Sequence, residues 1–147
     1  MRNWCAYLAI VILVLSSLPS TKSTAEATVG ISIDKIVENQ YIQGRVFGMD
    51  ASKYSQYKVI VYVLTDKWYI HPYAIGGEGK SYASIDSNGT WSIPTLKREF
   101  GAYKVAALIV EKNYKPSTML NNIDSIKSVA RIVKETGYKA GDKDWKL

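Results

Sequence analysis

The chain is poor in the residues that most often carry catalysis or metal binding. Its 147 residues include one histidine, His71, and one cysteine, Cys5. Zinc and copper sites need several imidazole or thiolate ligands, so the sequence argues against both, and we expect no cofactor. A nucleophilic triad needs a base beside its nucleophile, and no Gly-x-Ser-x-Gly motif accompanies His71. The composition therefore disfavours an enzyme, and we assign no catalytic residue.

The chain also lacks an apolar run long enough to cross a bilayer. Residues 4–18 are almost wholly apolar, follow a charged start and precede a polar stretch. A membrane-spanning helix needs about 20 apolar residues, whereas this arrangement, followed by small residues, is typical of a secretory signal. We therefore expect residues 1–27 to be a signal peptide, cut after Ala25 or after Ala27. The alternative is a retained membrane anchor.

Cleavage would also remove Cys5, which precedes the apolar run. The mature chain would then have no thiol, which excludes disulfides, thiolate chemistry and a lipoprotein anchor. A cysteine-free exported domain of about 120 residues must be held by an ordinary hydrophobic core, and that length suffices for a single domain. We expect a periplasmic or extracellular protein with no stable membrane insertion after cleavage.

The chain has a basic charge balance but no run of basic residues. The net charge is +6, and removing Arg2, Lys22 and Glu26 with the signal leaves +5. Because the lysines are scattered, a solvated basic surface explains them better than a polyanion site. We therefore expect no nucleic-acid partner, and a glycan or an envelope protein as the partner class. The oligomeric state does not follow from the sequence.

Residues 31–112 contain short β-rich runs separated by turn residues, a pattern that predicts an all-β fold, an antiparallel β-sandwich of about seven strands. Residues 31–36 alternate as an edge strand, and residues 41–48 place Ile42 and Val46 on a buried side. Residues 57–65 and 102–112 are apolar at nearly every position, which predicts central strands buried on both faces. Something besides the opposite sheet must then cover their second face.

Two further local patterns complete the expected domain, residues 28–135. Asn88-Gly89 predicts a tight turn, after which Trp91 and Ile93 point inward. Apolar residues spaced three and four positions apart then predict an amphipathic helix over residues 120–135, which would cover the exposed sheet face. Its apolar positions are Met119, Ile123, Ile126, Ala130 and Val133. We expect residues 136–147 to be a polar, basic tail.

The candidate binding site is the densest aromatic stretch, Trp68-Tyr69-Ile70-His71-Pro72-Tyr73. Aromatic rings stack on the apolar faces of sugars, while their polar groups form hydrogen bonds at the edges. Trp68, Tyr69, His71 and Tyr73 are therefore the candidate contact set. Strand alternation places Trp68 with Ile70 on one face and Tyr69 with His71 on the other, and Pro72 favours a sheet margin. The competing interpretation is that Trp68 fills the core.

Four segments carry a resemblance to known domains: Gly44-Arg45-Val46-Phe47-Gly48, Tyr57-Lys58-Val59-Ile60-Val61-Tyr62-Val63, Trp68-Tyr69-Ile70-His71-Pro72-Tyr73 and Asn88-Gly89-Thr90-Trp91. Over residues 31–111 the chain resembles small exported bacterial β-sandwich domains that occur alone or beside carbohydrate-active modules. The resemblance implies an immunoglobulin-like or fibronectin-like fold and a binding or accessory role.

Three functions are consistent with these observations. The first is a non-enzymatic exported module that binds a glycan or a protein through the aromatic contact set. The second is a small hydrolase or lyase acting on an envelope polysaccharide, with His71 or a tyrosine as its base. The third is a structural or assembly protein whose exposed strand edges pair with neighbours.

Overall fold

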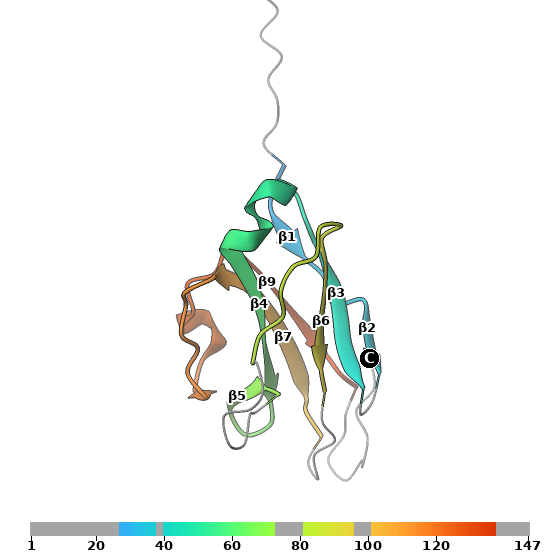
Figure 1. Ribbon diagram of the computed structural model, residues 1–147. Coiled ribbons are helices and arrows are strands. Elements are labelled where there is room, and N and C mark those ends of the chain that lie inside the picture. Colours follow the sequence, from blue (N-terminus) through green and yellow to red (C-terminus); the bar gives the residue numbers. More distant parts are fainter. Residues whose placement is uncertain (1–26, 38–39, 73–80, 96–100, 138–147) are drawn as a thin grey trace, which may run out of the picture.

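Two antiparallel sheets make up the part of the chain that the computed structural model describes, which is residues 27–37, 40–72, 81–95 and 101–137 (Figure 1). The predicted β-sandwich is thereby confirmed at the level of two packed antiparallel sheets. Within these ranges no helix has the length and apolarity of a membrane span. Apart from Ala27, Thr136 and Gly137, the predicted signal peptide and tail lie outside the described residues.

The first sheet is built around β3, with β1 and β2 along one side of it and β6 along the other. The second sheet has the order β8-β5-β4-β7-β9. The edge strand expected over residues 31–36 is divided between β1 and β2. The strands are β1 (Gly30–Ile31), β2 (Lys35–Val37), β3 (Tyr41–Phe47), β4 (Tyr57–Leu64), β5 (Trp68–His71), β6 (Thr90–Pro94), β7 (Lys104–Glu111), β8 (Met119–Leu120) and β9 (Ala130–Glu135), with short 3-10 helices η1 (Ala51–Gln56) and η2 (Ile123–Ser125).

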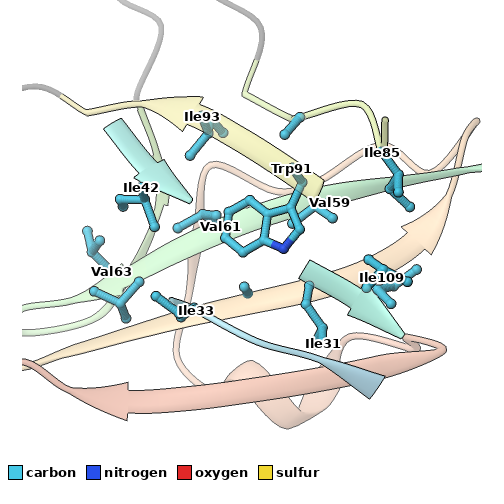
Figure 2. Packing of buried hydrophobic residues seen from close by; sticks show 14 of the residues in the cluster. Ile31, Ile33, Ile42, Val59, Val61, Val63, Ile85, Trp91, Ile93 and Ile109 are labelled. Atoms are coloured by element: carbon cyan, nitrogen blue, oxygen red, sulfur yellow. The ribbon is translucent and has the colours of Figure 1, made fainter. Parts of the chain in front are cut away.

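Trp91 occupies the centre of the core between the two sheets. Figure 2 shows its indole surrounded by isoleucines and valines from both sheets, and its side chain is fully buried. Gly44 lies opposite Trp91 on β3. A Cβ atom at Gly44 would lie 2.7 Å from Cζ2 of Trp91 and would collide with the backbone carbonyl oxygen of Ser32. The absence of a side chain at Gly44 therefore lets both the indole and the chain between β1 and β2 approach β3.

The strands β4 and β7 pair along their whole length and are buried on both faces, as predicted. Val59, Val61 and Val63 of β4 face the core between the sheets. Ile60 and Tyr62 face the opposite way, into a second core on the outer side of the sheet. The expectation that an additional element covers this second face is also confirmed.

The covering element is not the predicted helix. Residues 112–126, here called the covering segment, contain β8 and η2 and cross the outer face of the second sheet (Figure 1). Ile123 and Ile126 are buried there, so those two predicted contacts are made without an α-helix. Residues 130–135 form strand β9 along β7. The helical prediction was wrong because a spacing of three or four also fits a 3-10 turn followed by a strand, and the alternation within β9 favours pairing with β7.

The predicted tight turn is present between β6 and the residues before it. The amide of Gly89 donates to the carbonyl of Asp86 at 2.8 Å, and the amide of Thr90 donates to Oδ1 of Asn88 at 3.0 Å. Gly89 adopts a φ of 82°, the left-handed region that glycine favours. Trp91 and Ile93, which follow this turn, point into the core as expected.

Candidate functional site

The aromatic stretch forms β5, and its side chains divide between the two faces of the sheet as predicted. The register pairs Tyr69 with Val63 and His71 with Val61 on the side that faces the other sheet. Trp68 and Ile70 lie on the outer face, within the second core. Among the described contact residues, the structure therefore separates Trp68 from Tyr69 and His71.

Trp68 and His71 are core residues in this structure. Trp68 is 7% exposed and His71 is 2% exposed. Nε2 of His71 and Oγ1 of the buried Thr95 share a hydrogen bond of 2.7 Å, which joins the end of β5 to the end of β6 in the opposite sheet. These contacts give both side chains structural roles, and the expectation that their rings stack on a ligand finds no support in their placement.

Tyr69 is the most accessible described member of the predicted contact set. It is half-buried against the core between the sheets, and its hydroxyl lies 3.4 Å from Oδ2 of Asp66. Removal from water and the neighbouring Asp66 carboxylate raise the pKa of the Tyr69 phenol. Tyr73, the fourth predicted contact residue, lies outside the described residues.

A different surface feature brings an aromatic residue together with polar ones. A hollow of about 340 Å³ lies beside η1 and the paired ends of β4 and β7. It combines an aromatic ring, two amides, a carboxylate and an ammonium group. Its lining residues are Gln56, Tyr57, Glu111, Lys112 and Asn113, and we call it the Tyr57 hollow.

Backbone pairing fixes the walls of the Tyr57 hollow. Tyr57 begins β4 directly opposite Glu111, the last residue of β7. The amide of Lys112 donates to the carbonyl of Gln56 at 2.8 Å, so the residue that ends η1 is tied to the chain leaving β7. The ring of Tyr57 is half-buried and packs against the core between the sheets. The hollow therefore has a fixed aromatic wall and an exposed polar rim.

The sequence contained a signal for this hollow that residue types alone did not reveal. Residues 57–65 and 102–112 are both expected to be central strands, and an antiparallel pairing of the two brings the start of one to the end of the other. Tyr57 and Glu111 meet for that reason. Gln56 and Asn113 flank these strand ends and carry no motif, which is why pattern reasoning overlooked them.

Two buried polar side chains on β4 attach the covering segment to the sheet. Nζ of Lys58 donates to the carbonyl oxygen of Tyr114 at 2.7 Å and lies 4.9 Å from the centre of the Tyr82 ring. The hydroxyl of Tyr62 donates to the carbonyl oxygen of Ser117 at 2.6 Å.

Burial shifts the pKa values of Lys58 and Tyr62. It lowers the pKa of the Lys58 ammonium, with a smaller contribution from the positive charge of Lys112, and it raises the pKa of the Tyr62 phenol. Perturbed groups of this kind also occur in active sites. Here each has a backbone carbonyl partner in the covering segment, which assigns them to structure.

Comparisons of the chain with models of protein families, with curated proteins and with solved structures find no match. Among the described residues no three histidine, cysteine, aspartate or glutamate side chains gather in a way that could hold a metal ion.

Proposed function

We propose that the protein is a non-enzymatic exported binding or accessory module whose ligand is a glycan held in the Tyr57 hollow. The observation that carries this proposal is the composition of the hollow. It brings the half-buried Tyr57 together with four polar residues, Gln56, Glu111, Lys112 and Asn113.

Each group in the hollow matches a part of a sugar. A pyranose ring has an apolar face that stacks on an aromatic ring, and its edge carries hydroxyl groups that donate and accept hydrogen bonds. The amides of Gln56 and Asn113 do both, Glu111 accepts, and Lys112 donates. The volume of about 340 Å³ is near the lower end of small-ligand sites, roughly 300–1,000 Å³. A single sugar residue or the end of an oligosaccharide fits that size.

We also propose that the sandwich belongs to the immunoglobulin-like or fibronectin-like class. The order of the second sheet supports this, because β4, β7 and β9 are neighbours in the way that strands C, F and G are in immunoglobulin-like domains. The strand β3 lies between the first strands and β6, which corresponds to neighbouring strands A, B and E.

Export rests on residues 1–27, with their charged start, short apolar run and small-residue cleavage site. Intact-mass measurement of the protein recovered outside the cytoplasm checks this proposal. The expected first residue is Glu26 or Thr28, and a recovered chain that begins at Met1 would contradict cleavage.

The hydrolase or lyase alternative is less well supported. Of its candidate bases, His71 or a tyrosine, His71 is almost fully buried and shares a hydrogen bond with the hydroxyl of Thr95. A general base must reach the proton that it abstracts from the substrate. The burial of His71 places its ring away from any substrate at the surface.

Titration of the ¹⁵N-labelled protein with a panel of cell-envelope oligosaccharides tests glycan binding. We expect shifts at the side-chain amides of Gln56 and Asn113, and roughly tenfold weaker binding in Tyr57→Ala because stacking is lost. Tyr103→Ala is the matched control, since Tyr103 is exposed and precedes β7 at the end remote from Glu111. Undiminished binding in Tyr57→Ala would contradict the site, and shifts centred on Tyr69 would return it to the aromatic stretch.

A further inference from the structure

The strand β9 forms one edge of the second sheet. Among the described strands it pairs with β7 alone. The amide of Thr136 donates to the carbonyl of Tyr103 at 3.0 Å. This bond shows which residues along β9 point their backbone groups toward β7. Since backbone groups alternate in direction along a strand, Arg131, Val133 and Glu135 turn their amide and carbonyl groups away from β7. The edge of β9 that faces away from β7 thus presents three residues whose backbone groups the ladder does not use, with β1 of the first sheet lying close to this strand.

The side chains of the same three residues lie on the outer face of the sheet. Arg131 is opposite Leu108, and Val133 is opposite Ala106, both of which belong to the second core. Val133 is 41% exposed, and Val129, just before the strand, is exposed as well. The edge therefore carries exposed apolar surface flanked by a cation on one side and an anion on the other.

We propose that two copies of this chain associate through β9, antiparallel and with the two-fold axis at Val133. In that register Val133 meets Val133 of the second copy, and Arg131 of each copy lies opposite Glu135 of the other. All the hydrogen-bonding groups at the open edge then find partners, because the pairing uses Arg131, Val133 and Glu135 alone. The resulting contact continues the five-stranded sheet across the dimer and closes on itself.

Charge favours this register over those with the axis at Arg131 or at Glu135. Moving the axis to Arg131 would place two arginines opposite each other, and moving it to Glu135 would place two glutamates opposite each other, both unfavourable. Lys134, the charged residue on the inner side of β9, donates to the carbonyl oxygen of Ile33 at 2.6 Å. Its ammonium group is therefore held by the opposite sheet and does not prevent another strand from pairing with the open edge.

The intrachain ion pairs of the two charged residues are compatible with this contact. Nη2 of Arg131 lies 2.6 Å from Oδ1 of Asp124, and an arginine has five N–H donors. Glu135 pairs with Lys104 at 3.3 Å, while its side chain remains 79% exposed. Each keeps polar atoms available for the second copy.

Sedimentation velocity of the purified protein over a range of concentrations tests the proposal. We expect a reversible dimer in the wild type and a monomer in Val133→Pro, which removes the central edge N–H. Proline is tolerated on an edge strand where its nitrogen faces away from the ladder, so the monomer should keep its fold and its circular dichroism spectrum. A wild type that stays monomeric at high concentration, or a Val133→Pro variant that still dimerises, would overturn the proposal.

Charge reversal tests the register. Arg131→Glu and Glu135→Arg should each weaken self-association roughly tenfold or more, because each places like charges opposite one another. An equimolar mixture of the two variants should form a one-to-one heterodimer, in which every opposed pair is again complementary. If either single variant fails to fold, the doubly reversed chain serves instead and should dimerise as the wild type does. Single variants that associate normally, or reversed charges that do not restore association, would overturn the register.

Discussion

Gly44→Ala is the substitution that most directly tests the packing between the two sheets. The new Cβ would lie 2.7 Å from Cζ2 of Trp91 and would collide with the carbonyl oxygen of Ser32. Neither neighbour can yield easily. The indole is fully buried at the centre of the core, and the amide of Ser32 donates to the carbonyl of Arg45 at 2.8 Å (Figure 2). The substitution therefore forces either the ring or the strand β3 to move.

The expected cost lies at the upper end of what overpacking a core produces, about 3 kcal/mol of unfolding free energy. Alanine also lowers the conformational entropy of the unfolded chain, and this gain of about 0.4–1 kcal/mol offsets only part of the cost of the collision. The net loss is then about 2–2.6 kcal/mol, which lowers the unfolding midpoint by about 1–1.3 M at a urea m-value of about 2 kcal/mol/M. Urea denaturation monitored by circular dichroism measures the shift.

Gly30→Ala is the matched control. Its Cβ would meet the ring of Phe47, which is 54% exposed and free to swing toward solvent. We expect a change in unfolding free energy of less than about 1 kcal/mol, because only the end of a flexible side chain has to move. The reasoning is refuted if Gly44→Ala is no more destabilising than Gly30→Ala.

Three further predictions concern the covering segment. Tyr62→Phe should lower the unfolding free energy by about 0.5–1.5 kcal/mol, measured by urea denaturation, because it removes the hydrogen bond to Ser117 while leaving that carbonyl near water. Ile123→Ala should lower it by about 2–5 kcal/mol, since the Ile123 side chain is buried between the segment and the sheet; a loss below about 1 kcal/mol would show that the segment does not seal the second core. In the folded state the pKa of Lys58 lies below its ordinary value of 10.5, so the unfolded chain binds more protons between those two values. Stability should therefore rise with pH through that window in the wild type relative to Lys58→Met, and a difference that does not vary with pH would contradict it.

Much of the sandwich could be predicted because its strongest signals are local. The runs that became β4 and β7 are apolar on both faces, which only a central strand accommodates. The turn at Gly89 and the inward direction of Trp91 followed from the preference of glycine for positive φ and from strand alternation. The need for a cover over the second face followed from the same apolar runs.

The form of that cover could not be predicted, because it depends on tertiary pairing. Ile123 and Ile126 are buried on the outer face either in a helix or in a 3-10 turn. The strand β9 gains its hydrogen bonds from the edge of β7, and a periodicity analysis of one segment does not include that edge. The β-branched pair Ile132-Val133 favours a strand, but the spacing of the apolar residues favours a helix as long as β7 is left out of account.

The candidate site was only partly predictable for a related reason. The alternation of side chains along a strand correctly placed Trp68 and His71 on opposite faces of β5, but it could not show that both faces are covered. Burial of Trp68 depends on the covering segment, and burial of His71 depends on contacts with the opposite sheet, including Thr95. Both partners are distant in sequence.

The two cores are coupled because β4 supplies both of them from the same backbone. Val61 fills one core, and its neighbour Tyr62 fills the other, so a displacement of this strand disturbs both at once. Such sharing favours a single cooperative unfolding transition over stepwise melting of separate layers. Trp91 lies in the core between the sheets and Trp68 in the outer core, so variants that keep only one of the chain's four tryptophans, Trp91 or Trp68, report on the two cores separately.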